Sequence, residues 1–214
     1  MIVLGLTGSS GSGKGYISDL FAKHGYSCLD TDAVCHELYG SGTECTAEMA
    51  EKIGSEILSQ DGSVDRKKLG SLAFSSDEVY RLMNEIAHKH VRIRTLEWIE
   101  EMKKSGVSVA VIDAPLLFEA GFDRICDINV AVTCDNATKV RRLRRRDGIS
   151  DDAIASRLGK QKPDPWYVMQ ADYVIDNSAS SEDSLSERVG VFCEMLDEIS
   201  HLSVKIRPRS GRRR

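Results

Sequence analysis

The residues best suited to chemistry form a glycine-rich run near the start of the chain. From Gly8 to Lys14 the sequence reads Gly-Ser-Ser-Gly-Ser-Gly-Lys, which fits the pattern G-x-x-x-x-G-K after an apolar run and before a helical pattern. Such a turn curls around phosphate oxygens, and the helix N-terminus behind it favours an anion. We expect the run to bind the triphosphate of ATP, with these contact residues: Gly8, Ser9, Gly11, Ser12, Gly13, Lys14, Gly15 and Tyr16.

Two features qualify this interpretation. A glycine-rich turn without any ligand is the alternative. In addition, Gly15 and Tyr16 follow the lysine, where a Ser or Thr hydroxyl usually binds Mg²⁺. Glycine has no side chain to coordinate a metal, so we expect water or another side chain to take that place and Mg²⁺ affinity or turnover to be reduced.

Carboxylates follow two of the predicted strands. Asp113 ends the apolar run 109–112, where a carboxylate can bind Mg²⁺ directly or through water; the alternative is that it caps the turn at Pro115. Asp30 and Asp32 follow the second strand, at the edge where open α/β sheets bind ligands. We expect Asp32 to orient an acceptor hydroxyl and take its proton, unless it merely caps a helix that starts near Ala33.

Positive charge is concentrated in residues 139–146, which hold six cations on little more than two helical turns. Arg142 and Arg146 are four residues apart and share a face, so we expect them to contact phosphate, with Arg142 also stabilising charge during transfer. The alternative is a solvated helix face paired with the acidic residues Asp147, Asp151 and Asp152.

The elements that must position these residues alternate between strand and helix patterns. Strands are predicted at 2–7, 26–30, 107–112, 128–133 and 173–176. Helices are predicted at 14–23, 43–59, 65–74, 77–104, 136–146, 150–160 and 182–200. Nearly continuous apolar strands indicate a sheet covered on both faces. The sequence therefore predicts a three-layer α/β fold of the P-loop NTPase type, with a parallel five-stranded sheet, a helical insertion and a lid.

Composition limits the remaining possibilities. The 214 residues suit one domain, and no run approaches the roughly 18 apolar residues of a membrane helix. The six cysteines show no metal-site spacing, so we expect free thiols, a cytoplasmic protein and no membrane partner. The tail 207–214 carries five arginines in a chain of net charge −4. We expect it to be solvated and disordered and the chain to bind no nucleic acid; contact with a polyanion is the alternative.

Taken together, these residues resemble the dephospho-coenzyme A kinase family, with matches from end to end of the chain. The matching segments are Leu6-Thr7-Gly8, Leu29-Asp30-Thr31-Asp32-Ala33, Asp61-Gly62 with Asp65-Arg66, Asp113-Ala114-Pro115-Leu116-Leu117-Phe118-Glu119, Arg142 with Arg146-Asp147, Gln161, and 171–177. The resemblance implies a kinase that uses ATP and Mg²⁺ to phosphorylate the ribose 3′-hydroxyl of dephospho-coenzyme A. It also implies an acceptor site formed by Asp32, His88, Pro115, Leu116, Leu117 and Glu119.

The resemblance also implies how the chain is organised into a core, an insertion and a lid. We expect a single kinase domain at 1–206, with its core at 1–33, 107–135 and 171–200, a substrate-binding insertion at 34–106 and a lid at 136–165. We expect a monomer or weak oligomer. Two alternatives remain open: another small-molecule or nucleoside monophosphate kinase, and a nucleotide-binding module whose catalysis is weakened by Gly15. His88 is followed by Lys89 where the family commonly has proline, which bears on the local helix path.

Overall fold

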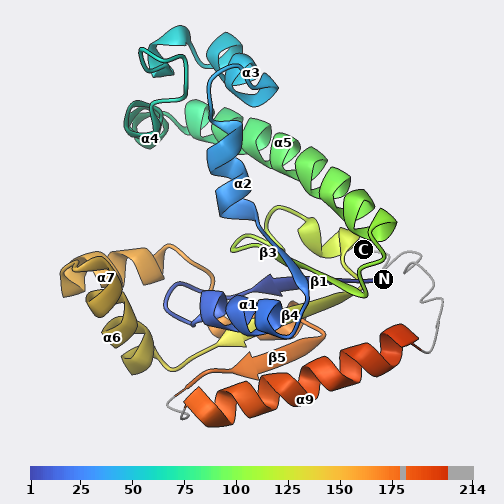
Figure 1. Cartoon of the computed structure of the whole chain (residues 1–214). Helices are drawn as coiled ribbons and strands as arrows, with labels where there is room; N and C mark the ends of the chain where they lie inside the picture. Colours follow the sequence, from blue (N-terminus) through green and yellow to red (C-terminus); the bar gives the residue numbers. More distant parts are fainter. Residues whose placement is uncertain (179–181, 202–214) are drawn as a thin grey trace. The chain divides into compact units, whose positions relative to one another are not determined.

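A five-stranded sheet with strand order β2-β3-β1-β4-β5 organises the larger part of the chain (Figure 1). The computed structural model describes residues 1–178 and 182–201. The strands are β1 (Ile2–Thr7), β2 (Ser27–Asp30), β3 (Val109–Asp113), β4 (Ile128–Thr133) and β5 (Tyr173–Asp176). The helices are α1 (Lys14–Lys23), α2 (Thr31–Leu38), α3 (Glu44–Lys52), α4 (Arg66–Ser75), α5 (Asp77–Lys104), α6 (Asn136–Asp147), α7 (Asp151–Gly159), α8 (Asp164–Gln170) and α9 (Glu182–His201), with short 3₁₀ turns at Ser55–Ile57 and Phe122–Ile125.

The burial of each strand matches its place in the sheet. All residues of β1 and β3 are buried, as expected for strands with neighbours on both edges and cover on both faces. The edge strands β2 and β5 are short and partly exposed, which limits the unpaired backbone they present. β1 pairs in parallel with β3 and β4, and β4 pairs in parallel with β5. The predicted α/β fold with a parallel five-stranded sheet flanked by helices is confirmed.

One face of the sheet packs against α1 and α9, which also contact each other. Phe21 of α1 and Phe192 of α9 meet in this core with ring centroids 6.1 Å apart. Tyr26 closes its end, because its hydroxyl donates to the Cys193 carbonyl and to Asp197. This core fixes α1, and therefore the turn before α1, against β1.

The strand register brings the carboxyl ends of four strands to one edge. Leu6 is paired with Asp113, Thr7 with Ala131, and Thr133 with Asp176. The glycine-rich turn leaves β1 at this same edge and leads directly into α1. Ligands of open parallel sheets bind at such an edge, so the fold places the predicted phosphate-binding run where a site is expected.

Among the described residues, 30–100 form a second compact unit, and 1–29 with 101–178 and 182–201 form the first. The second unit has its own core, built on Met49, Ile57, Leu69 and Ile86. Its helix α2 begins at Thr31 and is capped by Asp30, whose side chain accepts hydrogen bonds from the N–H groups of Asp32 and Ala33.

Several predicted boundaries were wrong. The helix expected at 43–59 ends at Lys52, because Gly54 adopts a φ of 134°, after which only a 3₁₀ turn forms. Helix α8 was not predicted, α2 was considered only as the alternative in which Asp32 caps a helix near Ala33, and the strands expected from 26 and 107 begin at Ser27 and Val109. The arginine-rich tail at 207–214 lies outside the described residues.

Two further findings concern cysteines and membrane helices. All six cysteines are free thiols, as predicted. Among the described residues, no helix has the length and apolar character needed to cross a membrane.

The packing of α1 predicts a large stability difference between two apolar truncations. We expect Phe21→Ala to lower the free energy of unfolding by about 3–5 kcal/mol, because Phe21 is completely buried and its loss leaves a cavity. Val191→Ala on α9, which is 62% exposed, should change it by less than about 0.5 kcal/mol. Urea unfolding of both variants measures the difference, and equal effects would contradict the assignment of the core.

Candidate nucleotide-binding and active site

The glycine-rich turn has the backbone geometry that its sequence predicts. Gly13 ends the turn in the left-handed region, with φ 90° and ψ 21°, and serves as the N-cap of α1. A Cβ atom on Gly13 would lie 2.1 Å from Asn177 Nδ2, so only glycine fits there. α1 then starts at Lys14, and the first N–H groups of a helix have no partner within the helix. Unpaired N–H groups at a helix N-terminus favour an anion, as the sequence predicts for this turn.

Lys14 and Asp113 form an ion pair at the edge of the sheet. The carboxylate of Asp113 ends β3 and its side chain is only 7% exposed, whereas the side chain of Lys14 is 17% exposed. The metal-binding role of Asp113 and the alternative, a cap for the turn at Pro115, both stay predictions. The structure therefore brings together the lysine predicted to bind phosphates and the carboxylate predicted to bind a metal.

Arg142 donates hydrogen bonds to backbone carbonyls of the turn. Its Nη1 donates to the carbonyls of Gly11 and Ser12 at 3.3 and 3.0 Å, and its Nη2 donates to Asn177 Oδ1 at 3.1 Å. Asn177 in turn donates to the Ser12 carbonyl at 2.8 Å. Arg142 and Asn177 thus bond carbonyls of the turn and use none of its N–H groups.

Two other arginines of α6, Arg144 and Arg146, pair with nearby carboxylates. Arg146 and Arg157 both donate to Asp147, and hydrogen bonds from Arg146 in particular lower the pKa of Asp147 to about 2. Arg144 pairs with Asp151 at 2.6 Å in a largely exposed bridge. Pairing with local acids, the alternative for this run, is thus present at Arg144 and Arg146, and the contact of Arg142 and Arg146 with phosphate stays a prediction.

The residues near the turn fit a magnesium ion held mainly by phosphates. No group of three or more His, Cys, Asp or Glu side chains that could hold a metal occurs in the described part of the chain. Mg²⁺ needs fewer, because one or two carboxylates and substrate phosphates commonly bind it. Asp113 offers such a carboxylate, and the buried Ser12 Oγ has no hydrogen-bond partner among the described residues. A Cβ on the exposed Gly15 would meet no atom within 4 Å, so the hydroxyl position is open.

The segment from Pro115 to Glu119 lies beside the end of β1. Thr7 Oγ1 donates to the Pro115 carbonyl at 3.2 Å, and Tyr167 donates to Glu119 at 3.3 Å. Burial raises the pKa of Tyr167, with a further contribution from Glu119. Leu116 is 46% exposed, but Leu117 is completely buried, so its side chain belongs to the core.

The predicted acceptor residues Asp32 and His88 belong to the unit 30–100. Asp32 is exposed in the first turn of α2, and the idea that it caps this helix is wrong, because Asp30 is the cap. His88 is half-buried in α5, where burial lowers its pKa below the usual value. A neighbour that the sequence did not single out, His90, is buried and bonded to Glu48 at 2.7 Å.

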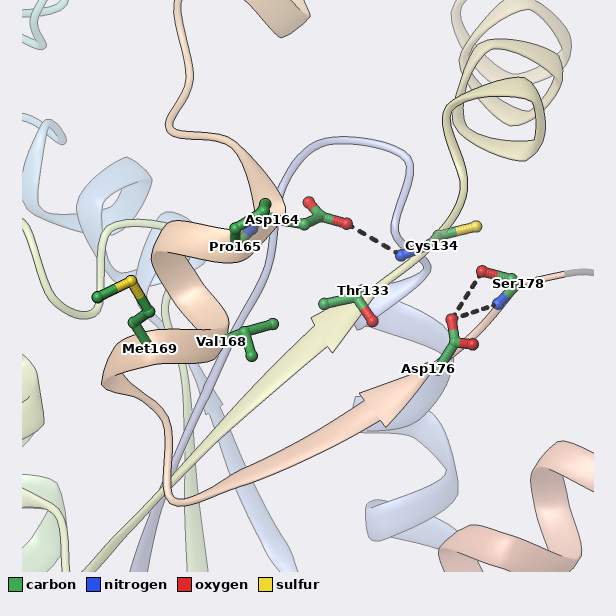
Figure 2. Close-up of a pocket in the computed structure, with 8 residues that line it drawn as sticks. All are labelled: Thr133, Cys134, Asp164, Pro165, Val168, Met169, Asp176 and Ser178. Carbon is green, nitrogen blue, oxygen red and sulfur yellow. Dashed lines mark hydrogen bonds between the residues drawn. The ribbon is translucent and has the colours of Figure 1, made fainter.

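A hollow of about 510 Å³ lies at the carboxyl ends of β4 and β5, beside α8. Figure 2 shows that polar groups in its wall bond one another: Asp164 accepts from the Cys134 N–H, and Asp176 accepts from the N–H and hydroxyl of Ser178. Val168 and Met169 add apolar surface. Because both carboxylates accept hydrogen bonds from the protein, the wall of the hollow stabilises the ends of β4 and β5.

Sequence reasoning missed several residues that contact the turn. Gln161 bonds Ser10, and Asp164 bonds Ser9 and Lys139. Gln161 entered only through the family resemblance, and Lys139 only as one of six cations. No periodic signal marks Asp164, which follows Pro163 in a segment that was not predicted to be helical.

Comparisons with known proteins agree with this geometry. Residues 2–183 match the family model described as Dephospho-CoA kinase. The chain is 36% identical over 200 residues to a dephospho-CoA kinase of Corynebacterium glutamicum, covering 94% of this chain and 100% of that one. It is 35% identical over 211 residues to one from Oryza sativa subsp. japonica, covering 98% and 90%.

A solved dephospho-CoA kinase from Campylobacter jejuni superposes with a TM-score of 0.69 at 22% identity, covering 94% of this chain and 98% of that one, which supports the fold. The chain belongs to the dephospho-CoA kinase family.

Proposed function

We propose that this kinase transfers the γ-phosphoryl group of ATP to the ribose 3′-hydroxyl of dephospho-coenzyme A, giving coenzyme A and ADP, the last step of coenzyme A synthesis. The proposal rests on one observation. Within the family match to residues 2–183, Lys14 and Asp113 form an ion pair where the glycine-rich turn leads into α1. Phosphoryl transfer depends mainly on positioning and on stabilising charge, which this arrangement is suited to provide.

In this mechanism the Lys14 ammonium can pair with either of two negatively charged groups. Its ammonium pairs with Asp113, and the β- and γ-phosphates of ATP offer more negative charge at the same edge. When the phosphates bind, Lys14 turns to them, and the Asp113 carboxylate becomes available to hold Mg²⁺ directly or through water. The metal neutralises charge on the phosphates when it is bound. The remaining contacts come from the backbone between Gly8 and Tyr16, while Arg142 holds the turn and Arg146 closes from the lid.

Asp32 is the proposed group that activates the acceptor. As the new O–P bond forms and the bond to ADP breaks, the proton of the 3′-hydroxyl moves to the Asp32 carboxylate. The exposed position of Asp32 at the start of α2 supports this role, because its side chain is not used as the helix cap. His88, Pro115, Leu116 and Glu119 are the proposed acceptor contacts, and Leu117 supports them from the core.

The setting of the enzyme is proposed as well. The free thiols of all six cysteines fit a reducing compartment, so we place the protein in the cytoplasm, acting as a monomer or weak oligomer.

An acceptor panel tests the reaction. Purified protein with ATP and Mg²⁺ should phosphorylate dephospho-coenzyme A and leave nucleoside monophosphates and shikimate-like alcohols unmodified. Lys14→Ala should lower kcat/KM by about 10²- to 10³-fold, because a preorganised cation is lost from the transition state. Lys23→Ala, in the last turn of the same helix, is the matched control and should keep the normal rate. Phosphorylation of a nucleoside monophosphate alone would replace our choice of acceptor.

The two neighbouring aspartates predict opposite results. Asp32→Asn should lower kcat by about 10²- to 10⁴-fold, since the amide cannot accept the hydroxyl proton. Asp30→Asn should leave kcat nearly normal, because asparagine also caps helices well. Steady-state rates with dephospho-coenzyme A measure both. A fast Asp32→Asn enzyme would remove this carboxylate from the mechanism.

Gly15 supports a second candidate, a nucleotide-binding module with little catalysis. The open space at Gly15 accepts a hydroxymethyl group, and its φ is normal for a helix, so Gly15→Ser should fold without strain. We expect this variant to reach half-maximal rate at a several-fold lower Mg²⁺ concentration, with the native protein already active. ATP binding without turnover in the native protein, together with turnover in Gly15→Ser, would favour the module instead.

A further inference from the structure

The carboxylate of Asp164 connects three segments around the phosphate-binding turn. Its Oδ1 accepts from Lys139 Nζ at 2.5 Å and from Ser9 Oγ at 2.9 Å, and its Oδ2 accepts from the Cys134 N–H at 3.2 Å. Figure 2 shows this side chain extending from the first turn of α8 to Cys134, at the point where β4 leads into α6. The turn, the start of α6 and the start of α8 therefore share one anion.

The cluster is buried, which makes it sensitive to change. Lys139 is 4% exposed and Ser9 is 6% exposed, although both are polar. A buried ammonium needs a paired charge, and removal of one partner of a buried pair is far more damaging than loss of an exposed one. Asp164 is the only carboxylate recorded against Lys139 in the described part of the chain, and three donors satisfy it.

Gln161 and Lys139 also contact the residues of the turn that follow Ser9. Gln161 accepts from the Ser10 N–H at 2.9 Å and donates to Ser10 Oγ at 3.2 Å. A Cβ on Gly11 would lie 3.0 Å from the Lys139 Cα, so the turn packs directly on the backbone of α6. Residues from both ends of the predicted lid thus fix a loop that has no secondary structure of its own.

We propose that Asp164 is a positioning residue for nucleotide binding. Through Lys139 and Ser9 it holds the glycine-rich turn in the curvature that aims its N–H groups at phosphate, before ATP arrives. Such preorganisation improves binding because the ordering of the loop does not have to occur during binding. The inference rests on the proposed function, since it assumes that the turn binds the phosphates of ATP.

Loss of Asp164 also costs stability, because it leaves the buried Lys139 unpaired, so the affinities for ATP and for the acceptor are compared within the same variant. The core contact of α8 comes from Tyr167, which is 2% exposed, and Asp164 bonds only the turn, α6 and Cys134. Its loss should therefore affect ATP more than the acceptor. Ser9 is the member of the cluster that belongs to the turn, so a variant at Ser9 tests whether Asp164 acts on the turn through this residue.

Asp164→Asn tests the proposal on the full chain. We expect the Kd for ATP, measured by calorimetry without acceptor, to rise about tenfold, while the KM for dephospho-coenzyme A changes less than twofold. Glu85→Gln, which removes an exposed ion pair with Arg81, is the matched control and should change neither value. Amide hydrogen exchange of residues 8–16, with no nucleotide added, should become faster in Asp164→Asn and not in Glu85→Gln.

A double variant tests the path. If Asp164 acts through Ser9, then Ser9→Ala/Asp164→Asn should bind ATP within about twofold of Asp164→Asn alone, because coupled residues give non-additive effects. Fully additive losses, unchanged exchange in the turn, or equal weakening of both substrates would overturn the inference. A native protein that binds no ATP would remove the proposed function, whereas native binding with normal ATP affinity in Asp164→Asn would remove only the role of Asp164.

Discussion

The site depends on a loop whose backbone N–H groups must stay available to a ligand while the rest of the loop is held still. A loop that bonds itself internally would use up those donors, and a loop without support would lose them to disorder. Here the carbonyls of Gly11 and Ser12 bond Arg142, and Asn177 also bonds the Ser12 carbonyl. Arg142 and Asn177 therefore support the loop through its carbonyls, whereas the Ser10 N–H is bonded by Gln161 and the Ser12 N–H by the Ser9 carbonyl.

The supporting side chains come from segments far away in the sequence. Arg142 and Lys139 belong to α6, Asp164 to α8, and Asn177 follows β5. All of them meet at the carboxyl edge of β1, β4 and β5, because parallel strands end together there. Burial of Lys139 and Ser9 strengthens the electrostatic part of this support, since the effective dielectric constant is lower inside the protein. Under the proposed function, these contacts link nucleotide binding to the segment expected to form the lid.

The paired charges near the site divide into two kinds. Lys14 with Asp113 and Lys139 with Asp164 are largely shielded from solvent, whereas Arg144 with Asp151 is exposed on both sides. Exposed pairs contribute little to stability and rearrange readily. Under the proposed function, the shielded Lys139–Asp164 pair keeps its geometry and holds the turn, whereas Lys14 leaves Asp113 for the phosphates. The same residue types thus serve different purposes according to their burial.

The sequence alone determined the glycine-rich turn, the strands with two-sided burial and the place of Asp113, because these depend on local spacing and apolar runs. It also determined the family, through motifs that each lie within a few residues. Only the tertiary structure decided that Asp30 rather than Asp32 caps α2, that Gly54 ends a helix early, and that Arg142 grips carbonyls. Asp164 was hidden for the same reason: its partners Ser9 and Lys139 are 155 and 25 residues away, and no local pattern records such a contact. A hydrogen bond between distant residues exists only once the sheet has brought them together.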